Sequence, residues 1–120
     1  MEINIKIKKG TTRTVLLMSN YAFKFPRVSN GHLIFLQGCY ANWSERHYCK
    51  MFKEMPDFYN KVAPSFFCSV FGLLQIQIRV EANRMELTDE QVDYFKDLCT
   101  DTKPNNFGYY KGKLVCVDYN

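Results

Sequence analysis

The residues best suited to carry chemistry lie in the last fifth of the chain, around a predicted loop and hairpin. Residues 100–106 have little apolar content and include a proline, which predicts a loop. The β-prone runs at 107–110 and 114–117 flank a glycine-containing turn and predict a hairpin. This hairpin returns Asp118 to the neighbourhood of Asn106, and Mg²⁺ prefers oxygen ligands of the kind that both side chains offer. Asn106 and Asp118 are therefore candidate metal ligands.

The order of these residues resembles part of a known enzyme family. The pattern Asp-x-Lys-Pro-x-Asn beginning at Asp101, followed by a hairpin and then Asp118, resembles the catalytic loop and the metal-binding Asp-Phe-Gly region of protein kinases. The resemblance implies that Asp101 orients or deprotonates an acceptor hydroxyl and that Lys103 assists the transferred phosphate. It also implies that Asn106 and Asp118 hold Mg²⁺ beside a bound ATP.

A lysine and a glutamate upstream extend the resemblance. Lys24, in the Ala-Phe-Lys of a predicted strand, is similar to the kinase lysine that contacts the α- and β-phosphates of the nucleotide. Glu45, the only acid in the body of the helix expected at 33–53, would be its partner. An acid among aromatic and small residues is costly to bury unless a cation meets it. Two alternatives stay open: an exposed Lys24, and a half-exposed Glu45 paired with Arg46 or Lys50.

The apolar periodicity predicts an α+β fold for a single domain, 1–120. It consists of a five-stranded antiparallel sheet with one long helix, then a short capped helix and a C-terminal β-hairpin. Three strands, a helix and two strands is also the order of a kinase N-terminal lobe, so by resemblance 1–80 form that lobe. By the same resemblance, 81–83 correspond to the hinge and 81–120 hold the short helix, the catalytic-loop-like segment and the hairpin. The strands are expected at 2–8, 13–18, 21–25, 65–71 and 73–80, and the capped helix at 88–99.

Two patterns also predict which side chains are buried. Residues 2–8 alternate strictly between apolar and polar types, which predicts an edge or near-edge strand with one buried and one wet face. Trp43 and Tyr48 are expected in the core rather than on a base-stacking surface. In the capped helix, Val92, Phe95 and Leu98 or Cys99 are expected to face inward. The long helix carries an apolar stripe at Leu36, Tyr40, Trp43, His47 and Met51.

Composition narrows the class of protein further. A chain of 120 residues with 47% hydrophobic content can form one modest core. Five cysteines without a Cys-x-x-Cys pair, no signal peptide and no membrane-length apolar run indicate free thiols in a reducing cytoplasm. The two histidines lack partners at the spacing of a zinc site. The net charge of +4 is compatible with an acidic partner or a nucleotide, but a solvated face is the preferred explanation.

The chain also departs from the kinase pattern. The turn at 9–12 has one glycine where the family has a glycine-rich series. Cys99 and Thr100 stand where the catalytic loop has His and Arg, and Asn120 stands where the Asp-Phe-Gly region has its glycine. The sequence has no activation segment and no large helical lobe after Asp118. These departures count against transfer of phosphate to a protein substrate.

Three functions follow, in decreasing order of support. The first is a non-catalytic, pseudokinase-like protein that binds another macromolecule, similar to small kinase-like accessory proteins of bacteriophages. That resemblance implies a host protein as partner, such as a component of antiviral defence, in the host cytoplasm, without a membrane partner. The second is a minimal ATP- and Mg²⁺-dependent phosphotransferase acting on a small molecule or on itself. The third is a nucleic-acid binder using Lys6, Lys8, Lys9 and Arg13, ranked last because no nucleic-acid motif is present. A truncated lobe would also leave apolar surface open, which favours self-association into a homo-oligomer or docking of a partner.

Overall fold

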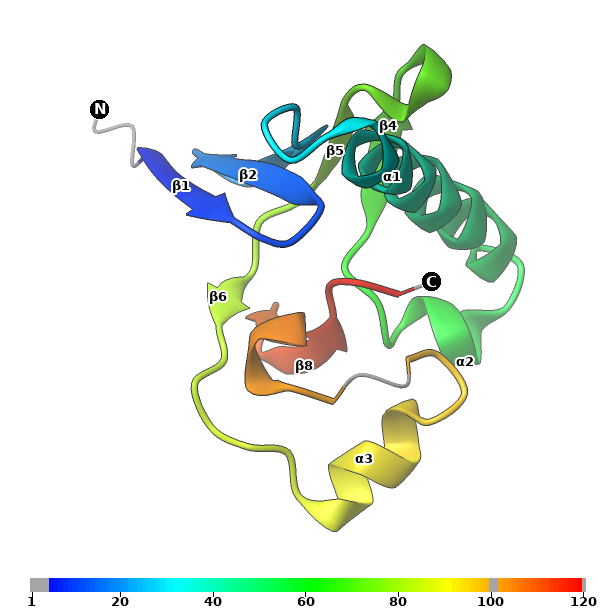
Figure 1. The fold of residues 1–120 in the computed structure, drawn as a ribbon. Helices are drawn as coiled ribbons and strands as arrows, with labels where there is room; N and C mark the ends of the chain where they lie inside the picture. Colours follow the sequence, from blue (N-terminus) through cyan, green and yellow to red (C-terminus); the bar gives the residue numbers. More distant parts are fainter. Residues whose placement is uncertain (1–4, 100–101, 120) are drawn as a thin grey trace.

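Two halves of unequal size make up the molecule, a five-stranded sheet with a long helix above and a three-stranded sheet with a short helix below (Figure 1). The computed structural model describes residues 5–99 and 102–119. The strands are β1 (Ile5–Lys9), β2 (Arg13–Met18), β3 (Tyr21–Pro26), β4 (Ser65–Cys68), β5 (Gln75–Ile78), β6 (Glu81–Ala82), β7 (Phe107–Tyr110) and β8 (Lys113–Cys116). The helices are α1 (His32–Phe52), α2 (Pro56–Tyr59), α3 (Asp89–Phe95) and the 3₁₀ turns η1 (Val70–Gly72) and η2 (Pro104–Asn106). The first sheet has the antiparallel order β1-β2-β3-β5-β4, and the second has the order β6-β7-β8.

The predicted α+β class is confirmed, with the five-stranded sheet, the long helix, the short helix and the hairpin all present. Thr88 forms a capping box at the start of α3, in which Gln91 N donates to Thr88 Oγ1 at 3.2 Å and Thr88 N donates to Gln91 Oε1 at 2.9 Å. The helix is shorter than expected and ends at Phe95. Lys111 and Gly112 make the hairpin turn with φ of 52° and 80°, as a two-residue turn between twisted strands requires. The sequence did not predict α2 or β6.

The five-stranded sheet has an unexpected polarity. Lys24, Gln75 and Gln77 lie on the face that α1 covers, and all three are buried. The opposite face carries a row of apolar side chains that crosses all five strands. Because period-2 alternation assigns side chains to two faces without saying which one is covered, the pattern alone did not reveal this. The row runs, in register, Ile7, Leu16, Phe23, Ile76 and Phe67.

Strand β1 lies at the sheet edge as predicted, but the burial expected for one of its faces is wrong. All five of its residues are exposed, and Ile7 retains 61% of its accessible surface. Its isoleucines extend the uncovered apolar row, and its Lys6 and Lys8 share the other face with Lys24. The strand is therefore held by backbone pairing to β2 rather than by burial of side chains.

Helix α1 is also turned the opposite way from the prediction. Trp43 keeps 52% of its surface exposed, and Tyr48 is exposed too, so neither is a core residue. The apolar stripe predicted on this helix faces away from the protein, and the small and polar face is inside. Gly38 allows α1 to approach the sheet closely, because a Cβ at this position would lie 2.5 Å from Thr12 O and 2.8 Å from Pro26. The inward residues of α1 are Gly38, Cys39, Asn42, Ser44, Glu45 and Cys49.

The apolar core lies in the lower half, where the end of α1, the hairpin and α3 meet. Phe95, Leu98 and Cys99 face inward as predicted, whereas Val92 is exposed. All five cysteines are free thiols, in agreement with the sequence. Among the described residues, no helix is long and apolar enough to cross a membrane. The core residues are Cys49, Val62, Phe95, Leu98, Cys99, Phe107, Cys116 and Tyr119.

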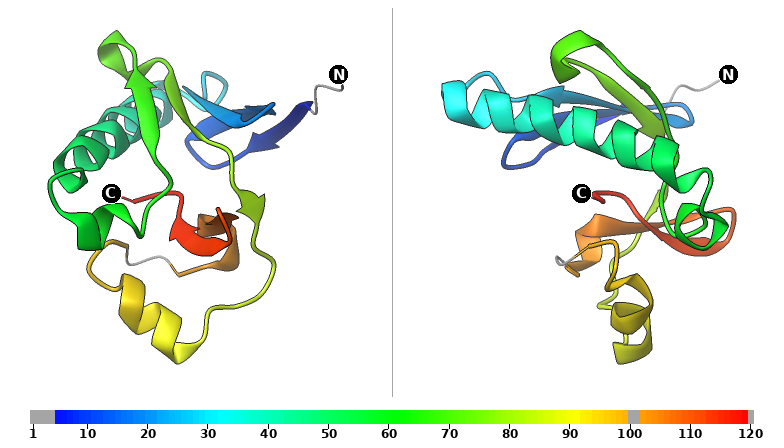
Figure 2. Two further views of the ribbon diagram at one scale, coloured as in Figure 1. Left: turned by 180° about the vertical axis from the view of Figure 1, so that it is seen from behind. Right: turned by 90° about the vertical axis from the view of Figure 1, so that its right-hand side faces the viewer.

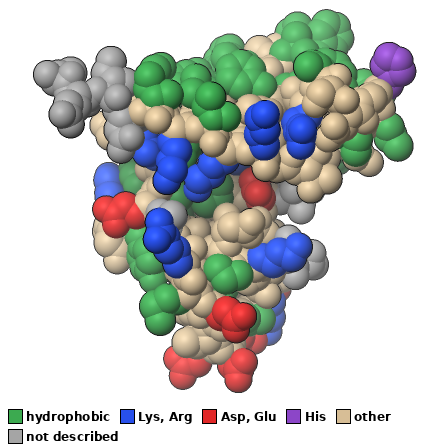
Figure 3. All heavy atoms as spheres, turned by 60° about the vertical axis from the view of Figure 1, so that its left-hand side comes forward, with side chains coloured by type: hydrophobic (Ala, Val, Ile, Leu, Met, Phe, Trp, Pro, Cys, Tyr) green, Lys and Arg blue, Asp and Glu red, His purple; other side chains and the backbone are tan. Residues whose placement is uncertain are grey.

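The views in Figure 2 place the three-stranded sheet and α3 below α1 and the five-stranded sheet. A waist separates the two halves on the face shown in Figure 3, and Lys and Arg side chains border it. The chain passes this waist in β6, whose Glu81 and Ala82 pair with Tyr109 and Gly108 of β7. The segment expected to act as a kinase-like hinge is thus a strand of the second sheet.

Candidate functional site

Four charged side chains from distant parts of the chain meet between the sheet, α1 and the hairpin. They are Arg13 at the start of β2, Lys24 in β3, Glu45 in α1 and Asp118 after β8, and we call them the ion cluster. Glu45 is completely buried and Lys24 is 2% exposed. Two cations and two anions balance in charge, which is the condition for keeping ionised groups away from water.

The strongest contact in the ion cluster is the double hydrogen bond between Arg13 and Glu45. Arg13 Nη1 donates to Glu45 Oε1 at 2.9 Å, and Nη2 donates to Oε2 at 2.7 Å. The planar guanidinium matches both carboxylate oxygens, a geometry that a lysine cannot provide. Nη2 also donates to Asp118 Oδ1 at 2.8 Å, so Arg13 joins the helix to the end of the hairpin.

The Lys24 ammonium has three N–H groups and three acceptors. Nζ lies 3.0 Å from Glu45 Oε1, 3.2 Å from Asp118 Oδ1 and 3.4 Å from the carbonyl oxygen of Val117. These contacts use the whole donor capacity of Lys24 within the protein.

Two buried amides frame the ion cluster. Asn42 Oδ1 accepts from Arg13 Nη1 at 3.1 Å and from Gln75 Nε2 at 3.3 Å. Gln75 Nε2 also donates to Glu45 Oε1 at 3.0 Å. Asn42 Nδ2 in turn donates to the carbonyl oxygens of Lys24 and Gly72, each at 2.9 Å. The amides therefore fix the rotamers of the charged groups and bind α1 to the sheet.

The hairpin delivers Asp118 because its end is bound to the upper half. Gln77 Nε2, buried on β5, donates to the carbonyl oxygen of Val117 at 2.9 Å. Ala63 N donates to Cys116 O at 2.9 Å, and the Tyr119 hydroxyl donates to Ala63 O at 2.8 Å. Asp118 is the most solvent-accessible member of the ion cluster, with 42% of its side chain exposed.

The ion cluster shifts the protonation of its buried members. Burial alone would raise the pKa of Glu45, but the charges of Arg13 and Lys24 and the hydrogen bonds from Arg13 and Gln75 lower it to about 2. Burial opposes the charged form of Arg13 as well, and the Glu45 and Asp118 carboxylates outweigh it and raise the Arg13 pKa. Glu45 is therefore a carboxylate at neutral pH despite its complete burial.

The predicted pairing of Lys24 with Glu45 is confirmed. Both alternatives are wrong, because neither side chain is exposed and Glu45 does not pair with its neighbours on the helix. Arg46 Nη1 instead donates to the backbone oxygen of Ser65, and Lys50 is exposed. A nucleotide-binding role for the pair stays a prediction.

The predicted loop residues are placed only in part. Asp101 lies outside the described residues. Lys103 is exposed, and its carbonyl oxygen accepts from Asn106 N at 3.0 Å within η2. Val117 N donates to Asn106 O at 2.8 Å, so the backbones of Asn106 and Asp118 lie close together, as the hairpin argument predicted. Their role as Mg²⁺ ligands stays a prediction; over residues 5–99 and 102–119, no three His, Cys, Asp or Glu side chains form a metal-binding group.

Arg13 is the important residue that the sequence argument misplaced. The sequence places it with Lys6, Lys8 and Lys9 in one basic region, yet it is buried against Glu45. One signal was present: Arg13 is two residues from Val15, which pairs with Lys24, so strand alternation places both cations on the same face. If both cations are buried on that face, more than one acid is needed to balance their charge.

The ion cluster as it stands is a rigid, charge-balanced connection between three elements. A phosphate group approaching Lys24 would have to displace Glu45 or Asp118 from it, and both are also held by Arg13. Comparison of the chain with protein-family models, with curated proteins and with solved structures gave no match. The resemblance to protein kinases therefore stays a prediction from the sequence.

Proposed function

We propose that this protein is a non-catalytic, kinase-like binding protein that docks on a partner protein through the outer face of its five-stranded sheet. The observation that carries the proposal is the apolar row on that face, from Ile7 on β1 to Phe67 on β4. An uncovered face of an antiparallel sheet is ordinarily polar, and large exposed apolar patches on monomeric proteins mark interaction sites. Further exposed apolar residues around the row are Ile5, Tyr21, Phe25 and Phe66.

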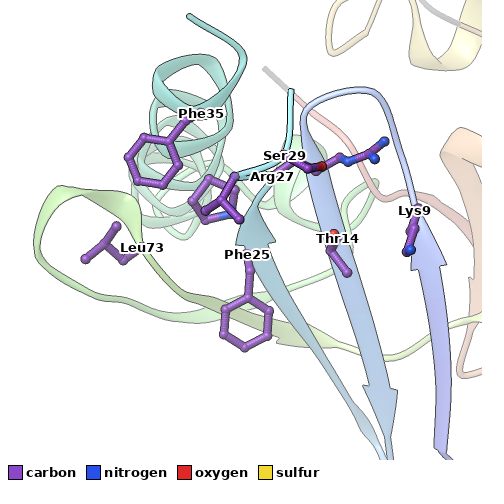
Figure 4. Close-up of a pocket in the computed structure, with 9 residues that line it drawn as sticks. Lys9, Thr14, Phe25, Arg27, Ser29, Phe35 and Leu73 are labelled. Carbon is purple, nitrogen blue, oxygen red and sulfur yellow. The ribbon is translucent and has the colours of Figure 1, made fainter. Parts of the chain in front are cut away.

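A hollow at one end of this face indicates the chemistry of the partner. It measures about 470 Å³ and is lined by Phe25, Phe35 and Leu73, with Lys9 and Arg27 also on its wall. Figure 4 shows Phe25, Phe35 and Leu73 around the hollow and Lys9 on the edge strand β1. An apolar anchor with carboxylates beside it would satisfy both parts of this surface. A second copy would bring Lys9 and Arg27 against another basic rim, so we favour a different, acidic protein.

The ion cluster supports the non-catalytic part of the proposal. All three N–H groups of Lys24 have acceptors inside the protein, and Arg13 bridges Glu45 to Asp118. The parts that would bind nucleotide thus act as a scaffold that sets α1 and the hairpin against the sheet. By the phage resemblance the partner would be a host protein in the host cytoplasm.

The test is whether substitutions on the sheet face weaken partner binding while a substitution elsewhere leaves it unchanged. Candidate partners are captured with the purified protein, identified, prepared pure, and titrated calorimetrically with wild type, Phe25→Asp/Phe67→Asp and the control Trp43→Asp. All three positions are exposed, so the variants should keep their circular dichroism and melting behaviour. We expect at least about a tenfold loss of affinity for the sheet-face variant, an unchanged control, and a negative heat-capacity change on binding.

Other results would overturn the proposal. Equal binding by Phe25→Asp/Phe67→Asp and wild type would remove the sheet face as the docking site. A concentration-dependent dimer in light scattering, dissociated by the same double substitution, would assign the face to a second copy. Loss of binding in Trp43→Asp alone would move the site to the exposed stripe of α1.

A second candidate is an ATP- and Mg²⁺-dependent phosphotransferase, which the closeness of Lys24, Glu45 and Asp118 favours. A ligand that binds only the folded state raises its melting temperature, so thermal-shift titration with ATP, with and without Mg²⁺, tests it directly. A Mg²⁺-dependent shift that disappears in Asp118→Asn, together with transfer of labelled phosphate, would replace the first proposal. No shift at millimolar ATP would eliminate the second candidate.

A further inference from the structure

A second hollow of about 540 Å³ lies on the waist between the two halves of the molecule, away from the apolar sheet face. Strands β1 and β2 form one wall, and the segment into β6 and the turn of the hairpin form the other. We call it the lysine groove, after Lys6, Lys8 and Lys111; the other lining residues used below are Arg79, Glu81 and Tyr109. We propose that the lysine groove binds single-stranded nucleic acid, a function independent of the docking surface proposed above.

The first observation is the direction of the β1 lysines. In the register of the sheet, Lys6 pairs with Leu17 and Lys8 with Val15, on the face that also carries Lys24. They therefore project toward the side of the sheet where the rest of the protein lies, while Ile7 points outward. Alternate strand residues are about 7 Å apart, so the two ammonium groups can follow an extended chain of phosphates. No ion pair joins Lys6 or Lys8 to any of the described residues.

The second observation is the excess of positive charge around the lysine groove. Among the residues that the structure describes, Lys6, Lys8, Arg79 and Lys111 line it as cations and Glu81 is the one acid. Figure 3 shows Lys and Arg side chains on both sides of the waist, with acidic side chains both at the waist and at the lower end of the molecule. A hollow lined by charges of one sign concentrates oppositely charged ligands, and counterion release from phosphates then favours binding.

The third observation distinguishes a nucleic acid from an acidic peptide. Tyr109 on β7 lines the lysine groove with 39% of its surface exposed, and Lys111 lies 5.3 Å from the ring centroid of the neighbouring Tyr110. An exposed ring beside a basic groove is the arrangement on which unpaired bases stack while the cations follow the backbone. A duplex keeps its bases stacked inside and could use only the cations. A peptide carboxylate would leave the Tyr109 ring without a matching planar partner.

This groove is distinct from the ion cluster. Its cations Lys6, Lys8 and Lys111 are exposed, whereas Arg13 and Lys24 are buried against Glu45 and Asp118. The sequence grouped Arg13 with the β1 lysines as one basic region. The fold instead separates Arg13 from them and brings Arg79 and Lys111 to their side.

The experiment is fluorescence anisotropy with a labelled, short single-stranded oligothymidylate over a range of salt concentrations. The groove variant is Lys6→Gln/Lys8→Gln, and its matched control is Lys50→Gln/Lys53→Gln, which removes the same charge from exposed positions on or beside α1. We expect the groove variant to bind about tenfold more weakly and to lower the slope of log affinity against log salt by about 1.4, as loss of two phosphate contacts on a single strand predicts. Tyr109→Leu should weaken binding with an unchanged salt slope.

Several outcomes would overturn the inference. Two of them are an equal loss of oligonucleotide affinity in the control variant and the absence of binding at low salt. The other two are tighter binding of the duplex than of the single strand, and complete displacement of the oligonucleotide by polyglutamate at matched charge. Displacement by an equal concentration of free nucleotide would show that a mononucleotide is the ligand. Melting temperatures of all variants check the fold, which the exposed positions of Lys6 and Lys8 should preserve.

Discussion

At the scale of single residues, Glu45 determines how the upper half is held together. A fully buried carboxylate loses its hydration, and this cost is offset only by close, well-oriented cations. Arg13 supplies two hydrogen bonds and Lys24 supplies a third, with the Gln75 amide completing the set around the carboxylate. Removing the acid alone would leave two buried cations with only the partly exposed Asp118 between them.

The depressed pKa of Glu45 predicts acid lability. A carboxyl group with an ordinary pKa of 4.5 and a folded-state pKa of about 2 binds its proton more readily in the unfolded chain. Its contribution to stability is therefore complete above pH 4.5 and is lost as the pH falls toward 2, in total by about 3 kcal/mol. Urea unfolding measured between pH 6 and pH 2 should show this loss.

The matched variant for this prediction is Glu45→Gln. At neutral pH it should lower the free energy of unfolding by about 3–5 kcal/mol, because it leaves buried charge uncompensated. Below pH 4.5 the difference between wild type and variant should shrink, since the wild type loses the same interaction. If the difference stays constant from pH 6 to pH 2.5, the assignment of the acid transition to Glu45 is wrong.

At the scale of elements, the orientation of α1 depends on its small inward face. A helix whose apolar stripe points outward must be held by something other than that stripe. Here Gly38 allows close packing on the β2–β3 end of the sheet, while Asn42 and Glu45 form the polar contacts. Trp43 stacks on His47 on the outer side, with ring centroids 5.0 Å apart. The rings of the outer stripe therefore contact one another on the exposed side of the helix.

The effect of Gly38→Ala tests this packing. Alanine normally stabilises a helix interior relative to glycine by about 1 kcal/mol, so propensity alone predicts a more stable protein. The added Cβ would clash with the Thr12 carbonyl and Pro26, and we expect destabilisation of about 1–3 kcal/mol instead. Gly10→Ala serves as the control, because the nearest contact of its Cβ is an ordinary 3.5 Å. A gain in melting temperature for Gly38→Ala would show that α1 lies farther from the sheet.

At the scale of the whole molecule, the apolar core and the polar layer occupy different places. The core lies in the lower half around Phe107 and Tyr119, and the sheet meets α1 through charges and amides. The apolar surface that would ordinarily be covered remains outside, on the sheet face and on α1. This distribution favours the proposed binding role, because exposed apolar surface costs free energy in water and a bound partner would remove that cost.

Paired truncations locate the core. Phe107→Ala removes a side chain that is 2% exposed and should cost about 3–5 kcal/mol of unfolding free energy. Trp43→Ala removes a larger ring from an exposed position and should cost less than about 1 kcal/mol. Chemical denaturation of both variants measures the two losses of unfolding free energy. A larger loss for Trp43→Ala would mean that the aromatic stripe of α1 is part of the core after all.

The sequence by itself determined most of the elements of this protein and one of its contacts. Strand alternation, the helical repeat and the Thr88 capping box act within a few residues, so they could be read locally and agree with the fold. The Lys24–Glu45 pair was predictable because a single acid in an apolar helix needs a cation. The positions of Gly38 and of the exposed Trp43 were not predictable in this way.

Only the tertiary structure decided which faces are covered and which charges meet. Alternation divides a strand into two faces, but whether the inner one is apolar depends on what packs against it, and here α1 brings a small and polar face. Arg13 and Asp118 are 105 positions apart in the chain, so no local pattern links them. The fold brings them together because the end of the hairpin is bound to the sheet through Val117 and Gln77, and that placement makes Arg13 part of the ion cluster and the lysine groove a separate surface.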